Sequence, residues 1–122
     1  MEKAKRTICV FCGSSSGSND AFLEAAHETG RLIAEHGFSL VFGGGGLGLM
    51  GATARAVRDG GAAVVGILPE FLRGLEPPLE TGEKVELVRN MQVRKRRMID
   101  LADAFLILPG GIGTLDEFFE VI

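Results

Sequence analysis

The sequence predicts an α/β fold in which one parallel sheet is doubly wound, with helices covering both of its faces. Three observations support this prediction. Short apolar runs recur along the 122 residues, and helical apolar spacing follows most of them. The runs are nearly continuous, which is typical of parallel strands buried on both faces. Most of the 18 glycines lie in clusters beside the expected strands, where tight turns need them.

Each expected strand is an apolar run, and several expected helices have a recognisable start or stop signal. Ser18 or Asn19 can cap the first helix, Gly37 stops it, and Gly60-Gly61 stops the second. The break around Pro77-Pro78 predicts a long surface loop over 69–82. In chain order we expect strand 7–12, a helix from Ser18 or Asn19 to Gly37, strand 38–42, a helix from Gly48 to Gly60, strand 62–68, a short strand 85–88, helix 91–102, a buried strand 104–108 and helix 114–122.

The length suits one hydrophobic core, so residues 1–122 are expected to form a single domain. The last expected helix ends in the apolar run 118–122 without a capping signal. Later elements or a partner subunit normally cover such an apolar end. We therefore expect the domain to be incomplete at its C-terminus.

Composition excludes several classes of partner. The net charge of −3 and the absence of Trp and Tyr argue against a nucleic-acid surface, which is usually basic and rich in stacking aromatics. No apolar stretch approaches the roughly 20 residues of a spanning helix, and no signal peptide is evident. We expect a cytoplasmic protein that binds neither nucleic acid nor membrane.

Cys9 and Cys12 have the Cys-x-x-Cys spacing of redox and zinc sites. Both lie in an expected strand, where an odd spacing sends the two side chains to opposite faces. A second pair of ligands is also missing. We predict buried thiols and no metal site.

Three loops are expected to leave strands at the edge where open parallel sheets bind ligands, beyond the carboxyl ends of the strands. Their small residues let backbone N–H groups approach an anion, and a helix N-terminus adds about half a positive charge. The alternative for each loop is a tight turn without a ligand. The loops are 13–17, which contains Ser14 and Ser15; 43–48, which contains Gly45; and Pro109-Gly110-Gly111-Ile112-Gly113-Thr114. The last is predicted to hold a phosphate, so the domain is predicted to bind nucleotides.

The run Gly43-x-Gly45-x-x-Gly48 also matches the dinucleotide fingerprint between a strand and a helix. It follows the second strand instead of the first, and an acidic partner for the ribose is lacking. A dinucleotide-dependent oxidoreductase is therefore a weaker interpretation.

Thr114-Leu115-Asp116-Glu117 has the spacing of a capping box, in which Thr114 and Glu117 satisfy each other's backbone donors. The alternative is chemical. A carboxylate one turn into a phosphate-binding helix would face the sugar and could stabilise positive charge at the anomeric carbon. The sequence leaves both interpretations open.

Helical phase separates the residues of the basic run 94–97. At about 100° per residue, Arg94 and Lys95 flank the apolar face while Arg96 points away. An inward arginine favours an anion, either a phosphate or a carboxylate such as Glu117. The alternatives are a structural ion pair or a solvated helix face. The apolar face is formed by Met91, Met98, Leu101 and Ala102.

Together these residues resemble the Lonely Guy family of cytokinin riboside 5'-monophosphate phosphoribohydrolases, earlier labelled lysine decarboxylases. The resemblance covers essentially the whole chain. Its final segment is the family signature, whereas Gln92 stands where the family pattern has His. The resemblance is carried by Cys12-Gly13-Ser14-Ser15, Gly43-Gly44-Gly45, Gly48-Leu49-Met50-Gly51, Met91 with Arg94-Lys95, and Pro109-Gly110-Gly111-x-Gly113-Thr114-x-x-Glu117.

The resemblance implies a Rossmann-like fold and a set of site residues. Arg94 and Glu117 would be the catalytic pair, and Glu76 would contact substrate if the Pro77-Pro78 loop aligns without a gap. The other substrate-binding positions would be Ser14, Ser15, Gly45, Met91, Lys95, Gly110, Gly111, Ile112, Gly113, Thr114, Leu115 and Asp116.

The implied reaction is hydrolysis of the N-glycosidic bond of a purine or cytokinin riboside 5'-monophosphate, which gives the free base and ribose 5-phosphate. The resemblance implies no cofactor, and it implies a homodimer or a larger homo-oligomer. The competing interpretation is a nonenzymatic nucleotide sensor or carrier that uses the same phosphate loop.

Overall fold

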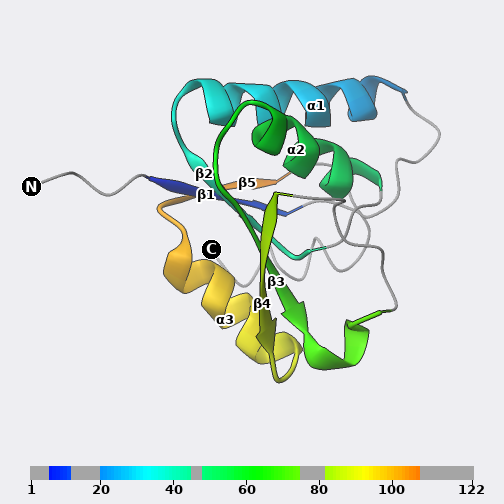
Figure 1. Cartoon of the computed structure of the whole chain (residues 1–122), viewed down its shortest axis with the longest axis vertical. Coiled ribbons are helices and arrows are strands. Elements are labelled where there is room, and N and C mark those ends of the chain that lie inside the picture. The colour runs from blue at the N-terminus through cyan, green and yellow to red at the C-terminus, as the bar shows by residue number, and fades with distance from the viewer. Residues whose placement is uncertain (1–5, 12–19, 45–47, 75–81, 108–122) are drawn as a thin grey trace, which may run out of the picture.

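The computed structural model describes residues 6–11, 20–44, 48–74 and 82–107. These residues form a doubly wound α/β domain whose five strands are all parallel, in the order β4-β3-β2-β1-β5. Helices α1 and α2 cover one face of the sheet and α3 covers the other (Figure 1). The predicted fold class is confirmed. The elements are β1 (Thr7–Phe11), α1 (Asp20–Glu35), β2 (Ser39–Phe42), α2 (Gly48–Asp59), β3 (Val64–Pro69), the short 3-10 helix η1 (Glu70–Leu72), β4 (Glu83–Val88), α3 (Met91–Leu101) and β5 (Ala104–Ile107).

The sheet divides the hydrophobic core into two layers, because successive side chains of a strand point to opposite faces. In β2, Leu40 and Phe42 belong to the layer beneath α1 and α2, whereas Val41 belongs to the layer above α3. Met98 of α3 is fully buried in the second layer, which Cys9 also shares. Cys9 is thus a buried thiol, as predicted; Cys12 lies outside the described part of the chain.

Helices α1 and α2 both end on a glycine in the left-handed conformation. Gly37 has φ +74° and Gly61 has φ +87°. The N–H of the next residue then reaches back to a carbonyl in the last turn, from Phe38 to Ile33 at 3.0 Å and from Ala62 to Val57 at 3.2 Å. Both predicted helix stops are confirmed, because a residue with a Cβ is strained at such a φ.

The two helices also pack closely at a glycine. A Cβ built at Gly30 of α1 would overlap the carbonyl oxygen of Thr53 and lie 2.7 Å from the Cβ of Ala56. The backbone of α1 therefore sits directly on α2, which is possible only without a side chain at this point.

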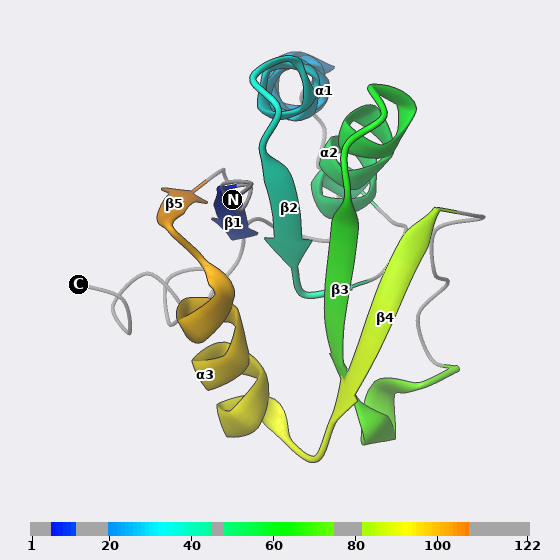
Figure 2. The same cartoon turned by 60° about the vertical axis from the view of Figure 1, so that its left-hand side comes forward.

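The expectation of a buried fifth strand is wrong for the described residues. In β5, Leu106 is 40% exposed and Ile107 is 39% exposed, and Ala104 is also exposed. The strand pairs with β1 and occupies an end of the described sheet (Figure 2). Burial depends on neighbours that an apolar run does not specify.

The remaining differences concern boundaries. Strand β3 begins and ends later than the expected 62–68, and β4 begins two residues before the expected 85–88. The expected loop 69–82 contains η1 near its start, while 75–81 lies outside the described residues. Pairing of β4 with β3 extends over all six of its residues, so its start is set by the partner strand and not by its own mixed sequence.

No helix in the described ranges is both long enough and apolar enough to cross a membrane.

Candidate functional site

Strand order reverses between β1 and β5, which makes this pair the switch point of the sheet. From β1 the chain passes through α1 to β2 and through α2 to β3, so the sheet first grows on one side of β1. Helix α3, which covers the opposite face of the sheet, then leads into β5 on the other side of β1. Phe11 and Ile107 are partners in the register at the carboxyl ends of the two strands. In open α/β sheets such a point opens a crevice for ligands. The predicted loops 13–17 and 109–113 follow these two residues closely in the chain, but they lie outside the described residues.

Arg94 of α3 places a positive charge at the carboxyl edge of the sheet. It lies in the second turn of α3, four residues before the fully buried Met98, and is itself only 9% exposed. The predicted inward phase of Arg94 is confirmed. Arginine remains protonated in proteins, so its guanidinium is a permanent charge held away from bulk water.

The guanidinium of Arg94 reaches the end of β2. Its Nη2 donates a hydrogen bond of 2.5 Å to the carbonyl oxygen of Gly43, the residue that follows β2. Its Nη1 lies 3.6 Å from the sulfur of Met91, one helical turn earlier. Two different nitrogens of one planar group are therefore engaged, which restricts the direction of the guanidinium.

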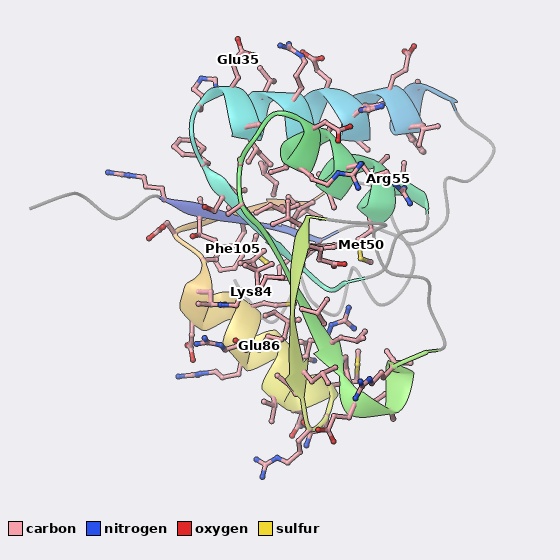
Figure 3. The ribbon with its side chains drawn as sticks, viewed as in Figure 1. Glu35, Met50, Arg55, Lys84, Glu86 and Phe105 are labelled. Atoms are coloured by element: carbon pink, nitrogen blue, oxygen red, sulfur yellow. The ribbon has the colours of Figure 1, made fainter. Side chains whose placement is uncertain are left out.

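The other arginines of the basic run make surface ion pairs. Arg96 has a side chain that is 78% exposed and pairs with Asp100 at 3.3 Å. Arg97 pairs with Glu86 of the neighbouring strand β4, with Nε 2.7 Å from Oε2. Glu86 is labelled in Figure 3. The hydrogen bonds that Arg97 donates to the Glu86 carboxylate raise the pKa of Arg97 above its usual value. The solvated-face interpretation therefore holds for Arg96 and Arg97 but not for Arg94.

Two further predicted positions lie on α3. Lys95 is partly buried, in agreement with a position flanking the apolar face. Met91, expected in that face, is 42% exposed, so this expectation is wrong. It occupies the first position of the helix, away from the core around Met98, and its sulfur contacts Arg94.

Most of the other predicted site residues lie outside the described residues, so their placement stays a prediction. They are Ser14, Ser15, Gly45, Glu76, Gly110, Gly111, Ile112, Gly113, Thr114, Leu115, Asp116 and Glu117. Among the residues whose placement is described, no group of three His, Cys, Asp or Glu side chains could hold a metal ion.

The sequence-based prediction missed Gly43 as a partner of Arg94. It interpreted Gly43 as part of a possible dinucleotide fingerprint, whereas the structure shows it against α3, 51 positions away from Arg94 in the chain. The sequence offered two separate hints of this contact, an arginine that faces inward and a glycine cluster without an assigned role. No pattern of neighbouring residues connects them, because Arg94 and Gly43 are 51 positions apart.

We expect Asn90→Ala to destabilise α3, the helix that carries Arg94. Asn90 is the N-cap of α3, and its side-chain oxygen accepts a 2.9 Å hydrogen bond from the N–H of Val93. Removing an N-cap of this kind costs about 1 kcal/mol. The measurement is the free energy of unfolding in denaturant, with Asn90→Asp as the control that retains the cap. An Ala variant as stable as the Asp variant would contradict the capping role.

The chain matches one protein-family model and is similar to several curated proteins. A family model described as possible lysine decarboxylase matches residues 50–122. The chain is 47% identical over 123 residues to cytokinin riboside 5'-monophosphate phosphoribohydrolase LOG3 of Arabidopsis thaliana, covering 100% of this chain and 57% of the relative. It is 50% identical over 117 residues to the probable phosphoribohydrolase LOGL9 of Oryza sativa subsp. japonica, covering 96% of this chain and 52% of the relative. The chain thus spans about half the length of these curated relatives.

Solved structures with the same fold include two molybdenum-cofactor proteins. The molybdenum cofactor binding protein of Rippkaea orientalis superimposes with a TM-score of 0.82 at 22% identity, covering 98% of this chain and 72% of that one. The Moco carrier protein of Chlamydomonas reinhardtii gives a TM-score of 0.80 at 23% identity, covering 96% and 70%. At this level of identity the likeness establishes the shared fold.

Proposed function

The chain belongs to the Lonely Guy (LOG) family, and from this premise we propose that its protein hydrolyses the N-glycosidic bond of a purine or cytokinin riboside 5'-monophosphate. The names of the curated relatives support this reaction class. The observation within the molecule that carries the proposal is the buried, oriented Arg94 at the ligand-binding edge of the sheet.

The proposed reaction joins water to the anomeric carbon and breaks the bond from that carbon to the base nitrogen. The base leaves as the free purine after gaining a proton, and the sugar product is ribose 5-phosphate. The transition state resembles an oxocarbenium ion, so the site must stabilise positive charge on the sugar while it holds a doubly charged phosphate.

We assign these tasks to different parts of the site. The backbone N–H groups of 110–114 would hold the 5'-phosphate at a helix N-terminus. Glu117 would face the ribose and stabilise the developing positive charge. Arg94 would orient Glu117 or contact the substrate directly, since its fork suits both carboxylate and phosphate. Ser14, Ser15, Gly45, Glu76, Met91 and Lys95 complete the proposed substrate contacts.

These residues fit lysine decarboxylation less well than they fit glycosidic hydrolysis. A pyridoxal phosphate enzyme forms a Schiff base with a lysine, and the chain has four lysines. Lys84 lies exposed on β4, and Lys3 and Lys5 lie outside the described residues. Lys95, next to Arg94 on α3, is assigned to the nucleotide in the proposed site.

The direct test is incubation of the full protein with AMP and, separately, with isopentenyladenosine monophosphate, followed by quantification of free base and ribose 5-phosphate. Stoichiometric release of both products supports the proposal, and the ratio of kcat/KM values gives the base preference. Saturable nucleotide binding without turnover would instead identify a sensor or carrier. Calorimetric binding of NAD or NADP without hydrolysis would favour the oxidoreductase interpretation.

Light scattering on the same sample tests the expected homodimer or larger assembly.

A further inference from the structure

We propose that Gly43 is a positioning residue for Arg94. The missing side chain at Gly43 leaves the space in which the guanidinium lies, and the Gly43 carbonyl sets its direction. The consequence for catalysis rests on the proposed function, whereas the contact itself does not.

The space at Gly43 is occupied by Arg94. A Cβ built on Gly43 would overlap Nη2 of Arg94 and would lie 2.8 Å from Cζ and 3.2 Å from Nε. The three nearest atoms all belong to the same guanidinium. Carbon atoms in favourable contact are about 3.5–4.0 Å apart, so a methyl group and the observed guanidinium cannot coexist.

The requirement for glycine at this position is one of space and not of backbone conformation. Gly44 and Gly48 have φ values of +80° and +58°, which disfavour other residues, but Gly43 is not among the glycines with positive φ. Alanine could therefore adopt the backbone of Gly43 without strain. The cost of a Cβ there arises from Arg94.

A Cβ at position 43 would shift the guanidinium, which is the end of a flexible side chain, and this shift would break its contacts. Gly43 directly follows β2 and is buried. Arg94 lies one helical turn before Met98, whose burial in the core fixes the position of α3. The hydrogen bond to the Gly43 carbonyl and the contact with the Met91 sulfur fix two edges of the guanidinium. Its rotamer freedom is thus lost on folding, before substrate arrives, which is how binding groups become preorganised.

A methyl group at position 43 would displace the guanidinium from this place. Displacing an active-site group by about 1 Å can lower the rate about 100-fold. We therefore expect Gly43→Ala to reduce kcat by about 10- to 100-fold, with a KM changed by less than about threefold. The reduction should occur only while Arg94 is present.

The test is a double-mutant cycle on the full protein with two readouts, thermal unfolding and hydrolysis of AMP. The variants are Gly43→Ala, Arg94→Ala and the two combined. Gly43→Ala is expected to lower Tm by about 4 °C or more, and adding Arg94→Ala is expected to recover most of that loss because the overlapping group is gone. In kcat, Gly43→Ala should add nothing to Arg94→Ala.

Gly30→Ala is the matched control. A Cβ at Gly30 also overlaps a neighbour, but that neighbour is the Thr53 carbonyl in the α1–α2 contact. Gly30→Ala should lower Tm, keep kcat per folded molecule within about twofold, and gain no Tm from the addition of Arg94→Ala. This pattern separates a general packing defect from an effect transmitted through Arg94.

Two results would overturn the inference. One is a Tm for the double variant no higher than that of Gly43→Ala alone; the other is a kcat loss from Gly43→Ala that persists in the Arg94→Ala background. If the wild-type protein releases no base, the proposed function fails while the stability cycle still decides whether Gly43 and Arg94 are coupled. A Gly43→Ala variant too unstable to assay leaves the comparison with the double variant as the deciding measurement.

Discussion

Arg94→Ala is expected to lower kcat/KM for a nucleoside monophosphate by about 10²- to 10³-fold, the loss typical when a preorganised electrostatic group is removed from an active site. Arg94 is 9% exposed, and Gly43 and Met91 direct its guanidinium, so a water molecule that replaces this group would not supply the same oriented charge. Arg94→Lys retains the charge but loses the planar fork, and we expect it to recover only a small part of the activity. Steady-state kinetics on AMP provide the measurement.

Arg96→Ala is the matched control for Arg94. It removes an arginine from the same helix, but from an exposed position where the ion pair with Asp100 contributes little. Its kcat/KM should stay within about twofold of wild type. If Arg94→Ala and Arg96→Ala had equal effects, the loss of activity would reflect the overall charge of α3 and not the specific guanidinium that contacts Gly43.

Glu117→Gln is expected to lower kcat by about 10³-fold with little change in thermal stability. The substitution separates the two interpretations of Glu117, because glutamine also satisfies the N3 position of a capping box. A cap therefore tolerates Gln, whereas a group that stabilises an oxocarbenium-like sugar needs the negative charge. Single-turnover base release and a thermal melt on the same preparation measure both effects.

Glu120→Gln controls for the loss of one carboxylate from the same segment. It should leave kcat within about twofold of wild type, because the proposed site does not use Glu120. Retention of activity in Glu117→Gln would show that the role of Glu117 is capping. A parallel loss of kcat and Tm would mean that the variant damages the segment, and Glu117→Asp would then report whether a carboxylate restores turnover.

Local rules predicted the features that depend on a few consecutive residues. The helix stops at Gly37 and Gly61 follow from the left-handed backbone that glycine permits, and both are present. The inward phase of Arg94 follows from about 100° of rotation per residue, and its burial confirms it. Neither conclusion needed a distant part of the chain.

Features that depend on neighbours were predicted less well. The apolar run of β5 is exposed at an end of the described sheet, and Met91 lies beside Arg94 instead of in the core. Conversely, the mixed sequence of β4 pairs over six residues because β3 offers a partner strand. The exposed fraction of a side chain is set by what packs on it, and periodicity does not identify that partner.

Four features could be predicted from the amino-acid sequence alone: the fold class, the alternation of strands and helices, the orientation of Arg94 within its helix, and the family. The first three follow from the periodicity of apolar residues along the chain, and the family follows from the resemblance of its motifs to the Lonely Guy pattern. The position of the Arg94 guanidinium and the groups that direct it depend on how distant segments pack together. Gly43 and Arg94 are 51 positions apart and meet because β2 and α3 pack across the sheet. A glycine needed for space, unlike one needed for its φ, can be recognised only when the group that fills the space is known.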